Sequence, residues 1–486
     1  MNTASKVFRS GLITTGAQFV SRIVDFATLI VLARILEPSD FGLVALAMSV
    51  ILITEAVLEL PTYAVLIATR TSDPDSLSTG FTLALIRSGL LTAITISAGY
   101  GLGVAAKDPR IFPLVMILSI GPCLRGMQNP KMTIFAQAQN FKPQAIVELV
   151  GKLGASFVVI SAVLLTGSYW AIAAGIVFAP LVMVIISFWF APFRPTLTLT
   201  RWRMYSRYLG VGVIVQSIRA TSWQMDRIIL TQFVPLPEIG KYSMASELVA
   251  VPVKALIQPL TGPLLAGLSA IEGIAAQRIG RAYLKSTVAI LTVLAPLFVF
   301  LMFFSEPIVV TILGDKWQAS AGLVVWLSAV VLIMLPQVVL NPALLAVGRV
   351  EMGIAIAATD LIVKGIAMFI LIPPLGVEGA ILSQSISAVF TMFGTFYLAK
   401  KVMRIGYWEH ILALTSPALA TLTLGAIFMI LNFLAAELRF ESRLIPLVFG
   451  VIVGVPVYCA TVVLLWHFAG RPSGLVSMAF NRFRKN

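Results

Sequence analysis

The chain has 486 residues, of which 59% are hydrophobic and only 12% are charged, and its formal net charge is +14. Because soluble domains are about 25% charged, this composition and a mean hydropathy of +0.97 exclude an ordinary soluble protein and indicate a membrane protein. Two cysteines inside apolar runs and two isolated histidines argue against a disulfide framework or a metal site. No Gly-x-x-x-x-Gly-Lys-Ser/Thr loop occurs, so no P-loop ATPase is expected, and we expect no cofactor.

Long apolar runs separated by short polar segments divide the chain into membrane spans. Lipid offers no hydrogen-bond partners, so such runs must form helices, and about 20 residues cross the bilayer. The pattern predicts an all-α polytopic membrane protein with about fourteen transmembrane helices. They are expected at residues 11–34, 41–68, 80–105, 111–128, 143–165, 170–190, 207–231, 242–270, 280–304, 320–345, 352–372, 377–399, 408–431 and 444–468.

Lysine and arginine are distributed unevenly between the two sides of these spans. With the N-terminus inside, the cytoplasmic segments hold 21 of the 35 basic residues and the opposite loops hold 7. This positive-inside bias predicts a multi-pass protein of the bacterial inner membrane with both termini in the cytoplasm. The net charge is then mostly an orientation signal and a contact for anionic lipids, and nucleic-acid binding is not expected.

A short pattern recurs in the second half of the chain. Residues 40–47 read Asp-Phe-Gly-Leu-Val-Ala-Leu-Ala, and residues 238–245 read Glu-Ile-Gly-Lys-Tyr-Ser-Met-Ala at an offset of 198 positions, which Gln18 and Gln216 share. Six predicted spans separate the copies, so the halves should have the same orientation, related by a pseudo-two-fold axis along the membrane normal. The predicted parts are an N-terminal six-helix lobe at 1–193, a basic cytoplasmic linker at 194–206, a C-terminal six-helix lobe at 207–403, and two extra helices with a basic cytoplasmic tail at 404–486.

Three stretches carry a family resemblance, namely residues 33–42, 140–149 and 226–245. With them the chain resembles the multidrug/oligosaccharidyl-lipid/polysaccharide (MOP) exporter superfamily, and within it the polysaccharide transporter family of Wzx-type flippases. The resemblance implies two lobes around a central cavity that opens alternately inward and outward. Its implied cargo is a polyprenyl-diphosphate-linked oligosaccharide unit for surface polysaccharide, lipopolysaccharide or exopolysaccharide biosynthesis, with H⁺ or Na⁺ coupling. A glycan polymerase and a chain-length regulator are the expected protein partners.

Fourteen ionisable residues fall within the predicted spans, where charges are costly and usually functional. Helical spacing predicts that Asp360 pairs with Lys364 and Glu148 with Lys152, and allows Arg22 to pair with Asp25. Glu247 and Lys254 share a helix face two turns apart, which predicts that no direct ion pair joins them. The fourteen are Arg22, Asp25, Glu55, Glu59, Arg87, Glu148, Lys152, Arg219, Asp226, Arg227, Glu247, Lys254, Asp360 and Lys364.

The chemistry of a diphosphate and a glycan selects candidate site residues from this inventory. Guanidinium groups bind phosphate in a bidentate manner, while aromatic and amide side chains bind sugars. Glu55 and Glu59 are expected one turn apart on one helix face, where two carboxylates repel each other, as suits a proton- or cation-responsive element. The expected substrate-binding residues are Arg22, Arg87, Arg219, Trp223, Arg227, Lys254, Gln18 and Gln216. The expected ion-coupling residues are Asp25, Glu55, Glu59 and Asp226. No catalytic residue is expected.

Two groups of alternatives remain open. Within the same superfamily, the chain could be a cation-coupled drug or metabolite antiporter or a flippase for the peptidoglycan lipid precursor. From another class, it could be a membrane-embedded glycan polymerase, ligase or acyltransferase. The short outward loops and the isolated histidines argue against an enzyme, and fourteen spans with arginines in the first, third and seventh argue against an antiporter.

Overall fold

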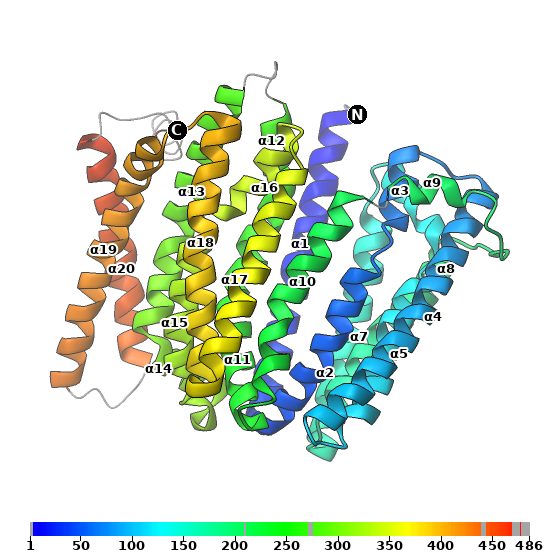
Figure 1. Ribbon diagram of the computed structural model, residues 1–486, viewed down its shortest axis with the longest axis horizontal. Helices are drawn as coiled ribbons and strands as arrows, with labels where there is room; N and C mark the ends of the chain where they lie inside the picture. Colours follow the sequence, from blue (N-terminus) through cyan, green and yellow to red (C-terminus); the bar gives the residue numbers. More distant parts are fainter. Residues whose placement is uncertain (1–2, 209, 271–275, 439–443, 469–476, 478–486) are drawn as a thin grey trace. The chain divides into compact units, whose positions relative to one another are not determined.

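The computed structural model describes residues 3–208, 210–270, 276–438, 444–468 and 477, and within these ranges it contains helices and no strand. The chain forms two compact units, Met1–Ser243 and Met244–Asn486. The all-α architecture predicted from composition is therefore confirmed (Figure 1). The lobe boundaries at 193 and 207 stay a prediction drawn from the repeat.

The first unit is built from long helices joined by short connections. In chain order they are α1 (Thr3–Ile35), α2 (Pro38–Val57), α3 (Thr62–Thr69), α4 (Pro74–Ala105), α5 (Ile111–Gly126), a 3₁₀ turn (Pro130–Met132), α6 (Thr133–Gln137), α7 (Lys142–Thr166), α8 (Trp170–Phe190), α9 (Trp202–Ser206), α10 (Val211–Leu230) and the start of α11 (Leu236–Pro252). Helix α1 packs on α7, α7 on α8, and α5 on α4, α8 and α2, while α10 packs on α2. One core cluster of this unit joins α2, α4, α5 and α8 around Leu43, Leu46 and Leu118.

Two glycines of the repeated pattern face each other in this unit. A Cβ atom on Gly42 would lie 2.2 Å from the carbonyl oxygen of Leu236 and 3.1 Å from the nitrogen of Gly240. A Cβ atom on Gly240 would lie 1.7 Å from the carbonyl oxygen of Pro38 and 3.0 Å from the nitrogen of Gly42. Only glycine allows two helix backbones to approach this closely. The first turns of α2 and α11 therefore meet backbone to backbone.

The second unit continues from α11 through a π-helical turn. Its elements are that turn (Val253–Ile257), α12 (Gln258–Ser269), α13 (Ala276–Phe303), α14 (Ser305–Leu313), a 3₁₀ turn (Asp315–Trp317), α15 (Ser320–Met334), α16 (Gln337–Ala346), α17 (Glu351–Leu375), α18 (Val377–Met403), α19 (Tyr407–Leu438) and α20 (Leu444–Phe468). Helix α13 packs on α15 and α19, and α19 on α20, around a core of Phe304, Leu424 and Phe428.

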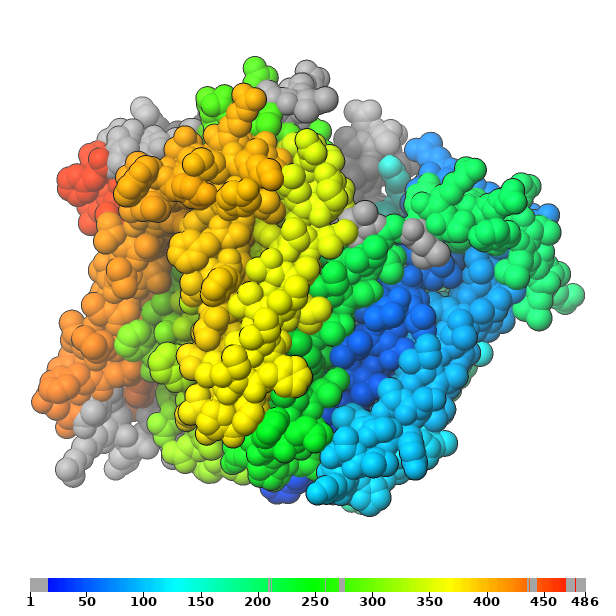
Figure 2. Space-filling model, in the orientation of Figure 1, coloured from blue at the N-terminus to red at the C-terminus, as the bar shows by residue number. Residues whose placement is uncertain are grey.

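The outer faces of the second unit are apolar. Figure 2 shows α17 (yellow) and α18 (orange) side by side on its surface, and these two helices pack on each other. They expose large apolar side chains that a soluble protein would bury, and that suit contact with lipid tails. Examples are Ile366, Phe369, Phe390 and Phe393.

The structure does not confirm the predicted count of fourteen spans. Every predicted stretch contains helix, but among the described residues twelve helical segments are long and apolar enough to cross a membrane. A thirteenth results if α5 and the segment Pro130–Gln137, bent by 49° to it, form one broken span. Helix α10 does not qualify, because Gln216, Arg219, Gln224, Asp226 and Arg227 make its 20 residues too polar.

Candidate functional site

The membrane-spanning segment Pro38–Thr69 is broken between α2 and α3. Helix α2 ends at Val57, and α3 begins at Thr62, directly after Pro61. Proline has no N–H group and cannot continue a helical hydrogen-bond ladder. The break therefore leaves carbonyl groups at the end of α2 that need donors from elsewhere.

Two neighbouring helices, α4 and α10, supply those donors. Arg87 of α4 donates from Nε to the carbonyl oxygen of Leu58 at 2.5 Å and from Nη2 to that of Glu55 at 3.1 Å. Ser217 of α10 donates to the carbonyl oxygen of Ala56 at 3.1 Å. A cation at the C-terminal end of a helix also interacts favourably with the helix dipole. Arg87 thus closes the end of α2.

The carboxylate of Glu55 is held by an arginine from another helix. Arg125, in the last turn of α5, donates from Nε to Oε1 at 3.0 Å and from Nη2 to Oε2 at 2.9 Å. Two parallel bonds of this kind form the strongest type of charged hydrogen bond. The prediction that Glu55 and Glu59 share one helix face is wrong, because α2 ends before Glu59, which is exposed in the break.

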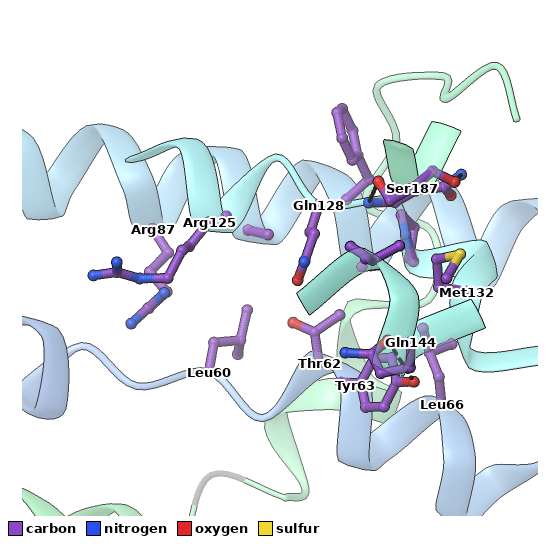
Figure 3. A pocket seen from close by; sticks show the side chains of 17 residues that line it. Leu60, Thr62, Tyr63, Leu66, Arg87, Arg125, Gln128, Met132, Gln144 and Ser187 are labelled. Carbon is purple, nitrogen blue, oxygen red and sulfur yellow. Dashed lines mark hydrogen bonds between the residues drawn. The ribbon is translucent and has the colours of Figure 1, made fainter. Parts of the chain in front are cut away.

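A cavity of about 170 Å³ opens beside the break. Figure 3 shows Arg87 and Arg125 together at one end of it, with the Gln128 side chain pointing toward Thr62. Tyr63 donates to Gln144 at 3.4 Å, and Gln144 in turn donates to Glu148 at 2.9 Å. The lining residues come from α3 to α8 and their connections, and they are Leu60, Thr62, Tyr63, Leu66, Gly80, Phe81, Ala84, Arg87, Arg125, Gly126, Gln128, Asn129, Pro130, Met132, Gln144, Val147 and Ser187.

A second polar cluster is buried between α10 and the start of α11. Arg227 donates from Nη1 to the amide oxygen of Gln224 at 2.7 Å and from Nε to the hydroxyl of Ser243 at 3.2 Å. The hydroxyl of Tyr242 donates to the carboxylate of Asp226. Arg227 is 6% exposed and Asp226 is 3% exposed. The structure thus places these two candidates inside a hydrogen-bonded core, and their cargo and coupling roles stay predictions.

Asp25 of α1 lies in an ion pair with Lys152 of α7. The prediction that Lys152 pairs with Glu148 is therefore wrong, since the partner of Glu148 is Gln144. Spacing along one helix suggested the pairing with Glu148, whereas the packing of α1 on α7 brings a carboxylate from a distant part of the sequence within reach.

The prediction for Glu247 and Lys254 is also wrong. The sequence predicted no direct ion pair, but Nζ of Lys254 lies 2.6 Å from Oε2 of Glu247. Two long side chains that extend toward each other span the two helical turns. Elsewhere in this unit, Ser387 donates to Oδ1 of Asp360 at 2.6 Å, and Lys364 is buried.

The remaining candidates lie on the surfaces of α1 and α10. Gln18, Arg22, Gln216 and Trp223 are exposed, and Arg219 is partly buried. Each of these side chains is in the first long helix of its predicted half. The structure therefore places them apart from the cavity, while Arg87 lines it.

Sequence reasoning missed Arg125, Gln128, Tyr63 and Gln144, and it counted Arg125 among the 21 cytoplasmic basic residues although it lies near the end of the predicted span 111–128. The predicted spans gave no signal for its partner, because Glu55 lies near the middle of the predicted span 41–68 and Arg125 lies near the end of the predicted span 111–128. The pairing depends on α2 ending at Val57, which hydropathy does not show.

Residues 31–322 match the family model described as "Polysaccharide biosynthesis protein". The succinoglycan biosynthesis transport protein ExoT of Rhizobium meliloti (strain 1021) is 23% identical over 305 residues, which is 60% of each chain. The teichuronic acid biosynthesis protein TuaB of Bacillus subtilis (strain 168) is 24% identical over 211 residues, or 42% of each chain. These alignments cover less than two thirds of either relative's length.

Solved structures show the same fold at low sequence identity. The structure titled "Lipid II flippase MurJ, inward closed conformation" matches with a TM-score of 0.73 and 12% identity, over 95% of this chain and 100% of the other. An inward-facing multidrug resistance MATE family transporter of the MOP superfamily matches with a TM-score of 0.58 and 13% identity, over 81% of this chain and 98% of the other. The chain therefore belongs to the polysaccharide biosynthesis protein family, and it is a multi-pass membrane protein with the helical fold of MOP-superfamily flippases and transporters.

Proposed function

We propose that this protein is a flippase that moves polyprenyl-diphosphate-linked oligosaccharide units across the bacterial inner membrane by alternating access, with both termini in the cytoplasm. Its membership of the polysaccharide biosynthesis family over residues 31–322 carries the proposal. Relatives named for succinoglycan biosynthesis transport and teichuronic acid biosynthesis support it. The fold, shared with a lipid II flippase, supports movement of a lipid-linked substrate.

The charge inventory of the helices is consistent with such a cargo. A diphosphate needs guanidinium donors in a partly desolvated site. We propose Arg22, Arg219, Arg227 and Lys254 as phosphate-facing residues of the transport path, with Gln18, Gln216 and Trp223 toward the glycan. Asp25, Glu55, Glu59 and Asp226 are proposed to take part in H⁺ or Na⁺ coupling. Anionic lipids, a glycan polymerase and a chain-length regulator are the proposed partners, and we propose no enzymatic activity.

Transport of a defined lipid tests this function directly. The purified full chain is reconstituted into liposomes with a polyprenyl-diphosphate-linked oligosaccharide on one leaflet, and arrival on the other leaflet is followed with a glycan-binding lectin. We expect protein-dependent transfer, reduced in Arg22→Gln and Arg219→Gln and retained in Arg349→Gln. Arg349 is an exposed arginine in the connection between α16 and α17.

The alternatives predict different cargo in the same liposomes. If the protein transfers the peptidoglycan lipid precursor and not the oligosaccharide-linked lipid, the chain is a flippase for that precursor. Uptake of cationic drugs against a proton or sodium gradient, without lipid transfer, would assign the chain to the antiporters. Extension of the glycan chain by the purified protein would identify a polymerase.

A further inference from the structure

The cavity beside the α2–α3 break has a size that limits what it can hold. Its volume is about 170 Å³. Pockets for drug-sized ligands measure about 300–1,000 Å³. An oligosaccharide is therefore too large, whereas a single phosphate group, with five heavy atoms, fits.

The charges around the cavity favour an anion. Two guanidinium groups, those of Arg87 and Arg125, lie at one end of it (Figure 3). The charges that act on Arg87 are those of Glu55, Glu59 and Arg125, and Glu59 is exposed. Glu55 is thus the only carboxylate bonded to either arginine in the described part of the chain, and Arg125 holds it. Among the described residues Arg87 bonds only to backbone carbonyl oxygens, so no carboxylate is bonded to its guanidinium group, although the charge of Glu59 acts on it through space.

Hydrogen-bond donors remain available at the same end. Arginine has five N–H donors, and the bonds within the described ranges use only Nε and Nη2 of each arginine. Within the same ranges the amide of Gln128 and the hydroxyl of Thr62 make no side-chain hydrogen bond, although both line the cavity. A group with several acceptor oxygens would satisfy these donors.

We propose that this cavity binds the phosphate group of a membrane lipid, and that the phosphate takes the place of Glu55 on Arg125. A phosphate offers Arg125 the same bidentate pair of oxygens as a carboxylate does, with additional oxygens for Arg87 and Gln128. Glu55 is then a displaceable counter-ion that holds the guanidinium in place while the cavity is empty of lipid. The phosphate belongs either to an anionic phospholipid or to the diphosphate of the cargo, and only the second source rests on the proposed function.

Binding is measured on the full chain in neutral-lipid nanodiscs, with three probes added separately: inorganic diphosphate, phosphatidylglycerol and polyprenyl diphosphate. We expect at least one lipid probe to bind, and Arg125→Gln to weaken it about tenfold, the equivalent of 1.4 kcal/mol. Arg125→Lys should weaken it less, because it keeps the charge but loses the fork. Glu55→Gln should tighten binding, because the competing carboxylate is removed.

Two further variants separate binding from folding. Gln128→Ala leaves the Arg125–Glu55 pair and the closure of α2 untouched, and it should still weaken binding severalfold. Arg110→Gln, which removes an arginine paired with Asp108 outside the cavity, should leave binding unchanged. Weaker or unchanged binding in Glu55→Gln, together with wild-type binding in Arg125→Gln and Gln128→Ala, would overturn the proposal.

The probes also identify the source of the phosphate. Selective binding of polyprenyl diphosphate indicates a subsite for the cargo, and selective binding of phosphatidylglycerol indicates a site for a bilayer lipid. Because this assay involves no transport, it can succeed when the flippase assay fails. Loss of binding in the cavity variants supports the cavity proposal whether or not the wild type transfers lipid. Lipid transfer by the wild type supports the flippase whether or not these variants lose binding.

Discussion

Gly42 and Gly240 meet in a reciprocal contact: a Cβ on the first would touch the carbonyl oxygen of Leu236 and the nitrogen of Gly240, and a Cβ on the second would touch the carbonyl oxygen of Pro38 and the nitrogen of Gly42. Pro38 and Leu236 are separated by the same 198 positions as the two glycines. Each copy of the pattern therefore contacts the other through equivalent atoms, which is the relationship that a local two-fold axis produces.

We expect Gly42→Ala and Gly240→Ala each to lower the folded amount of protein sharply. The added methyl group would lie 2.2 Å and 1.7 Å, respectively, from a backbone oxygen, so the two helices must separate. Gly89→Ala in α4 is the matched control, because its methyl group meets nothing within 4 Å and alanine favours a helix by up to about 1 kcal/mol. Thermal melts of the purified proteins in detergent test this, and equal melting temperatures in all three variants would contradict it.

We expect substitutions of Arg227, in the buried polar cluster between α10 and the start of α11, to lower the stability of the protein. Arg227→Gln leaves the buried side chains of Gln224 and Ser243 without their donor, and each buried polar group left unpaired costs about 1–3 kcal/mol. Arg227→Lys keeps the charge but cannot reach both acceptors, so it should also be destabilised. The exposed Arg349→Gln should change stability by less than about 0.5 kcal/mol.

The same variants decide between a structural and a cargo role for Arg227. Lower abundance and lower melting temperature, in proportion to the loss of transport, assign Arg227 to the structure. Normal abundance and stability with transport lost would place it on the cargo path.

The Asp25–Lys152 pair predicts a rescue by charge exchange. Asp25→Lys or Lys152→Asp alone brings two like charges together between α1 and α7, which disfavours their packing. The double variant restores opposite charges at the same two positions, so it should recover most of the protein level in membranes. Quantitative immunoblotting of membrane fractions measures the recovery. A double variant no more abundant than the worse single variant would rule out this pairing.

Asp108, in the connection before α5 and outside the spans, should make the stability of the protein depend on pH. Hydrogen bonds from the Arg110 side chain hold the pKa of Asp108 below its usual value near 3.8. A depressed pKa in the folded state means that the contribution of this carboxylate to stability is complete above pH 4 and is lost as the pH falls through the folded-state value. Asp108→Asn should therefore melt slightly below wild type at pH 6, and the difference should shrink as the pH falls below 3.8. A constant difference across that range would exclude the linkage.

The sequence alone determined the membrane class, the helical stretches, the family and the repeated pattern, because hydropathy and glycine spacing act along the chain and need no tertiary partner. It also identified Arg87 as a candidate, since a charge inside a span requires an explanation. The partners of the charged side chains were not determined by the sequence. Spacing suggested Glu148 for Lys152 and a shared face for Glu55 and Glu59, whereas helix packing supplied Asp25 and Arg125 instead.

Only the tertiary structure showed that the segment Pro38–Thr69 is broken and that a small polar cavity lies beside the break. It also showed that Arg87 of α4 and Arg125 of α5 bond to residues at the end of α2. The physical reason is that a buried charge takes whichever partner lies at the same depth on a neighbouring helix. That partner depends on how helices distant in the sequence pack, and no periodicity within one helix encodes it.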